Sequence, residues 1–161
     1  MIQIRRKVFE TNSSSTHSIT LNYEAPLQQN YMPIDDEGFI NIPLIGFCSC
    51  ETYDQQLEKL AYVIELAACK SGIYLNIGLN NKERDQILEE LYECDLFLEI
   101  QDEIINYVGS DCIGIRIAED ACYGYIDDSS DYVDMNEFYD ECGGLINFVF
   151  SDSYLHYEYN G

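Results

Sequence analysis

The chain has 161 residues, of which 47% are hydrophobic, including 14 Tyr and seven Phe. This aromatic content excludes a disordered acidic tail, and the length suits one folded domain over residues 1–161. The chain carries 30 Asp and Glu against eight Lys and Arg, and three of the bases lie at positions 5–7. We therefore do not expect direct binding to nucleic acid, because the chain lacks the stripe of Lys and Arg that would neutralise the phosphates.

The apolar segments are short throughout the sequence. No run approaches the roughly 18 apolar residues of a membrane span, and the first 20 residues lack the apolar segment of a secretory signal. We therefore expect a cytoplasmic protein that does not contact a membrane.

The N-terminal third predicts strands separated by loops. Residues 2–9 alternate with period two and predict a strand, and residues 17–23 predict its neighbour. The serine run between them has the composition of a turn, because Ser and Asn side chains bond local backbone groups. Residues 22–38 contain two prolines and a glycine and predict a loop, and "FINIPLI" at 39–45 predicts a short strand.

The middle of the chain predicts helices. Thr52 and Gln55 match a capping box, and apolar residues from Leu57 to Ala68 then recur at helical spacing until Gly72. A second helix is expected from Asn80 or Asn81 through Leu91. A third covers residues 98–108.

The last third returns to strand patterns. Residues 112–118 and 122–127 predict strands, and "DMNEFYDE" at 134–141 predicts one or two helical turns capped by Asp134. The runs "GLINFVF" and "SYLHYEY" predict two strands joined by Ser-Asp as a hairpin. The fold class predicted is α+β, with a mostly antiparallel sheet packed with two or three helices.

Three segments carry a resemblance to a known family. They are "RRKVFETNSSSTHSI" at the N-terminus, "YGYIDDSS" at 123–130 and "LINFVFSDSYLHYEYNG" at the C-terminus. Together they resemble a family of uncharacterised bacteriophage and mobile-element proteins, with an E-T-N-S-S-S-x-H-S motif followed by Y-I-D-x-x-S and F-x-F-x-x-x-S-Y patterns. The resemblance implies a small acidic phage-type protein that acts inside the host cell. Asp128 and Ser129 stand where that family has His and Gln, which argues against an inherited enzymatic activity.

A catalytic interpretation centres on His17, one of only two histidines. Strand alternation puts His17 on the face of Ser15, Ile19 and Leu21, which predicts a buried histidine with a hydrogen-bonding partner. The alternative is a small, possibly degenerate enzyme or ligand-binding site that joins the Ser13–His17 segment to a distant acid. Its candidate residues are Ser14, Ser15, His17, Asp127 and Asp128. No G-x-S-x-G elbow surrounds these serines, so we do not expect an enzyme.

No metal or cofactor is expected from the sequence. The seven cysteines are scattered without C-x-x-C spacing, and the Cys48–Cys50 pair alone supplies only two ligands. The acidic segment from Asp127 fails as an EF-hand loop, because its sixth position is Tyr132 and its twelfth is Phe138. Irregular coordination of a divalent ion by its aspartates stays open.

The favoured interpretation treats the acidic C-terminal third as a binding surface. After Arg116 the chain has eleven acids and no Lys or Arg. Carboxylates interleaved with aromatic rings have the charge of a nucleic acid, which suggests a mimic that binds a basic nucleic-acid-binding host protein such as a CRISPR effector or a restriction nuclease. The predicted contact residues are Asp127, Asp128, Asp131, Tyr132, Asp134, Glu137, Asp140 and Glu141. The alternative is that these acids form an ordinary solvated surface.

Overall fold

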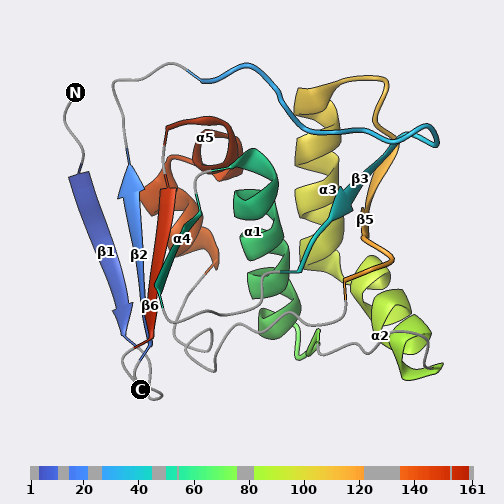
Figure 1. Ribbon diagram of the computed structural model, residues 1–161, viewed down its shortest axis with the longest axis horizontal. Helices are drawn as coiled ribbons and strands as arrows, with labels where there is room; N and C mark the ends of the chain where they lie inside the picture. The colour runs from blue at the N-terminus through green and yellow to red at the C-terminus, as the bar shows by residue number, and fades with distance from the viewer. Residues whose placement is uncertain are drawn as a thin grey trace.

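The computed structural model describes residues 4–10, 15–21, 27–44, 50–53, 55–75, 82–121, 135–152 and 154–159. Side chains are described at most of these positions, but not in β1, β2, β4 and β6, where the backbone alone is considered. Within these ranges the chain forms six strands and five helices. A four-stranded sheet lies at one side of the molecule, the helix α1 lies in the middle, and a two-stranded sheet lies beyond it (Figure 1).

The four-stranded sheet joins the two ends of the chain. Its strands are β1 (Ile4–Glu10), β2 (Ser15–Leu21), β6 (Tyr154–Tyr159) and β4 (Cys50–Tyr53), in this spatial order. Every pair is antiparallel, and β2 and β6 occupy the centre. The register between β1 and β2 shifts between Arg5 and Lys7, which marks a bulge.

The smaller sheet pairs β3 (Phe39–Ile42) with β5 (Gly114–Ile117) in parallel. Side chains from two helices satisfy the outer edge of β5. The Ile115 N–H donates to Oε1 of Gln101 at 3.0 Å, and the Ile117 N–H donates to the Tyr92 hydroxyl at 2.9 Å. Backbone donors that would otherwise be buried without partners are thereby paired.

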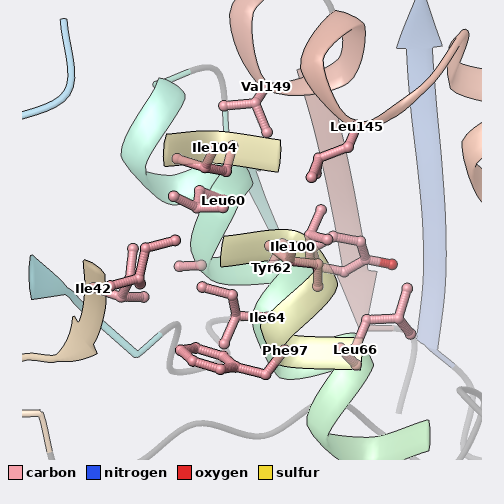
Figure 2. Close-up of a cluster of buried hydrophobic side chains, with 14 of the residues drawn as sticks. Ile42, Leu60, Tyr62, Ile64, Leu66, Phe97, Ile100, Ile104, Leu145 and Val149 are labelled. Carbon is pink, nitrogen blue, oxygen red and sulfur yellow. The ribbon is translucent and has the colours of Figure 1, made fainter. Parts of the chain in front are cut away.

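The core surrounds α1 (Gln56–Lys70). Every residue of this helix from Lys59 to Ala68 is buried, because sheets and helices cover it on all sides. Figure 2 shows Leu60, Ile64 and other α1 side chains meeting Phe97, Ile100 and Ile104 of α3 (Asp95–Val108) and Val149 of α5 (Leu145–Phe150). The large apolar area that α1 removes from water is the main stabilising contribution of this region.

Two further helices each contribute described side chains to the core. The helix α2 (Lys82–Glu93) buries Leu91 and is fixed by Arg84, whose guanidinium donates to the carbonyls of Ala118 and Ala121. The helix α4 (Met135–Cys142) buries Met135 and Cys142 at its two ends. No helix in the described ranges is long and apolar enough to cross a membrane.

The predicted α+β class is confirmed, but its arrangement differs from the expectation. The strands fall into two separate sheets, one of them parallel, where a single largely antiparallel sheet was expected. The described helices number five, where two or three were expected. The predicted strand at 122–127 lies outside the described residues, and so do residues 11–14 of the predicted serine turn. Ser15 and Thr16 of that turn belong to the strand β2 instead.

Two local predictions were wrong. The segment "GLINFVF" forms the helix α5 instead of a strand, so the predicted hairpin does not form and β6 pairs with β2 and β4. The predicted capping box is absent as well. Thr52 lies within β4, and Gln55 occupies the N-cap of α1 without a side-chain capping bond.

Candidate functional site: an acidic surface on α2 and α3

The structure describes only a small part of the predicted contact region. Glu137, Asp140 and Glu141 lie on α4, which confirms the helix predicted there, and Asp140 is exposed. The side chains of Glu137 and Glu141 are not described. The remaining predicted contact residues, Asp127, Asp128, Asp131, Tyr132 and Asp134, lie outside the described residues.

A second group of acids, which the sequence analysis did not single out, lies on α2 and α3. Nine carboxylates of these two helices are exposed. We call this group the α2–α3 acidic surface; it consists of Glu83, Asp85, Glu89, Glu90, Glu93, Asp95, Glu99, Asp102 and Glu103. Helical geometry arranges two sets of three with a spacing of four residues, Asp85–Glu89–Glu93 on α2 and Asp95–Glu99–Glu103 on α3. Neighbours at this spacing lie about 5–6 Å apart at Cβ.

Three of the described bases have internal partners. Lys59 and Arg84 are buried, with Lys59 Nζ donating to the Ser151 carbonyl at 2.9 Å. Arg116 NH2 forms an ion pair with Asp35 Oδ2 at 2.6 Å. Lys70, at the end of α1, is partly exposed, and the side chain of Lys82, the first residue of α2, is not described. The α2–α3 acidic surface therefore presents a local excess of negative charge to solvent.

The predicted acidic helix α4 adjoins this surface. Burial raises the pKa of the Tyr139 hydroxyl, and the negative charges of Glu103 and Glu99 raise it further. The helices α3 and α4 both pack against α5.

An open groove lies at the α2–α3 junction. Its volume is about 630 Å³, and its lining includes Ser71, Glu90, Glu93, Cys94 and Asp95. Ser71 Oγ and Cys94 Sγ lie 2.9 Å apart within it. Three members of the acidic surface therefore border a concave feature that has room for a side chain of a partner.

A separate polar cluster surrounds Arg116 on the small sheet. Its Nε donates to Asn41 Oδ1 at 2.8 Å and its NH2 donates to Asp35 Oδ2 at 2.6 Å, while its guanidinium carbon lies 4.6 Å from the centroid of the Phe39 ring. Hydrogen bonds from the Asn41 side chain and the Phe39 N–H, together with the charge of Arg116, lower the pKa of Asp35 to about 2. This geometry braces the turn before β3, and the guanidinium is already occupied by internal partners.

The structure places only part of the alternative catalytic set. Ser15 and His17 lie two residues apart in β2, with Tyr159 opposite Ser15 and Tyr157 opposite His17. Ser14, Asp127 and Asp128 lie outside the described residues, and the side chain of His17 is not described. The predicted burial of His17 and the proposed catalytic grouping stay predictions.

The structure is that of an α+β protein with exposed carboxylates on α2 and α3. Compared with known proteins, the chain matches no protein-family model, no curated protein and no solved structure. Among the side chains that the structure describes, no three His, Cys, Asp or Glu residues gather as a metal site. The α2–α3 acidic surface is therefore the feature from which a function is inferred.

Proposed function

We propose that this protein is a phage- or prophage-type acidic inhibitor that mimics nucleic acid. It binds a basic, nucleic-acid-binding host defence protein, such as a CRISPR effector or a restriction nuclease, inside the host cell. The observation that carries this proposal is the α2–α3 acidic surface, where nine exposed carboxylates stand on two neighbouring helices without an exposed described base.

Physical chemistry supports a partner with a basic groove. Regularly spaced carboxylates on a rigid helix resemble the row of phosphates that such a groove binds, and long-range attraction accelerates the encounter. The groove beside Glu90, Glu93 and Asp95 adds a concave position for a Lys or Arg side chain of the partner.

The proposal is tested by competition for DNA. A purified restriction nuclease and a purified CRISPR effector are each loaded with their fluorescent nucleic acid, and the protein is titrated in. We expect displacement of the nucleic acid from at least one of them, with an association rate that falls steeply as salt screens charges beyond about 8 Å. Failure to displace nucleic acid from either protein, even at low salt, would contradict the proposal.

Matched charge reversals locate the contact. Glu89→Lys with Glu99→Lys changes the α2–α3 acidic surface, and Asp36→Lys with Asp111→Lys makes the same change in net charge at exposed positions around the turn before β3. We expect the first pair to weaken binding by at least about tenfold and the second pair to have a much smaller effect, because only the first pair faces the basic groove. Equal effects of the two pairs on binding would mean that the acids of the α2–α3 acidic surface contribute only to solubility.

The contact residues predicted in the acidic segment 127–134 require their own variant. Asp131→Lys with Asp134→Lys tests whether the contact extends beyond α4 into the acidic segment 127–134.

A further inference from the structure

The helix α3 carries one exposed apolar side chain within its acidic surface. Its residues Phe97, Ile100 and Ile104 are buried, and Figure 2 shows them meeting side chains of α1. Leu98 instead has 39% of its surface exposed. Every other apolar residue of α2 and α3 is buried or partly buried, so Leu98 is the single exposed one on these two helices.

Leu98 lies among carboxylates of the α2–α3 acidic surface. Asp95 is three residues before it and Asp102 is four residues after it, so both are its neighbours on one helical face, at about 5–6 Å between Cβ atoms. Glu99, the next residue in the chain, is exposed as well. Asp95 also lines the groove at the α2–α3 junction. An apolar side chain therefore stands within the acidic row, one helical turn from the groove.

Helix formation does not require a leucine at position 98. Glutamate, glutamine and lysine have helix propensities close to that of leucine, and the neighbouring exposed positions Asp95, Asp102 and Asn106 are all polar. A single exposed leucine is common on protein surfaces. The position of Leu98 gives it a consequence, because a partner attracted by the surrounding carboxylates also meets this apolar side chain.

Charge alone would give the α2–α3 acidic surface little selectivity among basic partners. Attraction between opposite charges raises the association rate with any basic surface, and it weakens as salt screens the charges. Differences in affinity between related complexes lie mostly in the dissociation rate. Burial of an apolar side chain slows dissociation through a short-range contact that salt does not screen.

We propose that Leu98 is the specificity-determining residue of the α2–α3 acidic surface, and that the basic groove of the partner contains an apolar pocket that receives it. This inference rests on the proposed function and narrows the class of partner. The carboxylates set the association rate, and Leu98 sets the dissociation rate. A partner that offers positive charge without an apolar pocket releases the protein quickly.

Binding kinetics of the wild type come first in the test. Purified restriction nuclease and purified CRISPR effector are each immobilised without nucleic acid, and poly-L-lysine serves as a polycation that has no folded pocket. We expect slow dissociation from at least one of the two proteins and fast dissociation from poly-L-lysine. A wild type that binds neither protein would overturn the proposed function and, with it, the role of Leu98.

The variant Leu98→Ala then tests this residue in a protein that binds. We expect its dissociation rate from the nuclease or effector to rise at least about fivefold, with the association rate and its salt dependence unchanged. Its kinetics on poly-L-lysine should equal those of the wild type. An unchanged dissociation rate, or an equal change on poly-L-lysine, overturns the role of Leu98 and leaves the proposed function standing.

Leu27→Ala is the matched control for that substitution. Leu27 is exposed to a similar extent, 43%, and lies outside α2 and α3. Its replacement should therefore leave both rates unchanged. Loss of binding to the same degree in Leu27→Ala and Leu98→Ala would contradict the assignment of the contact to α3.

Two further variants separate the apolar contact from an effect on folding. Leu98→Met keeps an apolar side chain of similar volume and should retain slow dissociation, while Leu98→Gln is a polar helix former and should behave as Leu98→Ala does. Circular dichroism confirms that each variant keeps its helices. Equal dissociation rates of the folded Met and Gln variants would show that no apolar pocket receives this side chain, which overturns the proposal.

Discussion

Arg116 shows how a single residue organises the small sheet. It is the last base in the sequence, and its hydrogen-bonding partners among the described residues come from the segment 35–41. Its guanidinium binds Asn41 on the neighbouring strand and Asp35 in the preceding turn, and stacks over Phe39. The fork of Arg matches several acceptors at once, so Lys at this position would not reproduce the contacts.

The Asp35 carboxylate makes this cluster sensitive to pH. Its pKa is lowered from 3.8 to about 2, so its contribution to stability is present above pH 3.8 and is lost as the pH falls toward 2. We predict that Asp35→Asn lowers the melting temperature at pH 6, and that the difference from wild type shrinks between pH 3.8 and 2. Differential scanning fluorimetry across this range measures the effect.

The exposed neighbour Asp36 provides the control. Asp36→Asn removes the same charge one residue away, outside the contacts of Arg116. Its effect on the melting temperature should be small at every pH. A constant difference between Asp35→Asn and wild type from pH 6 down to pH 2 would show that the carboxylate charge is not the stabilising feature.

At the scale of elements, periodicity predicted the long helices well. The helix expected from Leu57 to Ala68 is found at Gln56–Lys70, and Gly72 follows it with φ of 75°. Helix α2 and helix α3 also lie close to their predicted ranges. These segments are long enough that apolar residues recur over several turns, which only a helix accommodates on one face.

Short apolar runs were harder to predict. "LINFVF" has too few residues for its period to separate a strand from a buried helix, and its β-branched and aromatic residues favoured a strand. The chain instead reverses at Gly143 and Gly144, whose φ values are 74° and 98°, and then begins α5. The four-residue strand β4 was missed because its pairing with β6 depends on contacts distant in sequence.

The edge of β5 depends on a hydroxyl group from α2. Replacement of Tyr92 by Phe removes the acceptor of the Ile117 N–H, while the ring can remain packed near Phe97. We predict that Tyr92→Phe lowers the free energy of unfolding by about 1–3 kcal/mol, because a buried donor loses its partner. Urea unfolding followed by circular dichroism measures this change.

Tyr107→Phe is the matched control for that substitution. The Tyr107 ring packs against Phe150 with centroids 4.3 Å apart, and phenylalanine keeps this contact. Its effect on unfolding should be clearly smaller than that of Tyr92→Phe. Similar losses from both variants would mean that the Tyr92 hydroxyl does not support β5.

At the scale of the whole molecule, the sequence predicted an acidic protein, but none of the acids exposed on α2 and α3 is among its predicted contact residues. Composition alone indicated a large negative charge, and α4 was correctly predicted as an acidic helix. The acids of α2 and α3 were not recognised as a surface, because a single sequence does not show which helical faces the fold leaves in solvent. The proximity of α3 to α4, seen in the effect of Glu99 and Glu103 on Tyr139, likewise depends on tertiary packing.

The same surface should cost the protein stability. Carboxylates four residues apart on a helix repel one another by about 0.2–0.5 kcal/mol per pair. Glu89 and Glu99 are the middle acids of the two rows, so Glu89→Gln with Glu99→Gln removes four such pairs. We predict that this double variant unfolds with a free energy higher by about 1–2 kcal/mol at low salt, and that it binds its basic partner more weakly.

Salt titration separates repulsion from other effects of the substitutions. The melting temperature of the wild type should rise with NaCl as the repulsion is screened, and the rise should be smaller in the double variant. The control Asp36→Asn with Asp111→Asn changes the net charge equally at exposed positions outside α2 and α3. If this control gains as much stability, the repulsion is a property of the total charge. If the double variant gains none, the two rows do not repel as their spacing requires. A gain confined to the Glu89 and Glu99 variant, joined to weaker binding, would mean that the fold tolerates local repulsion because the acids are needed for the partner.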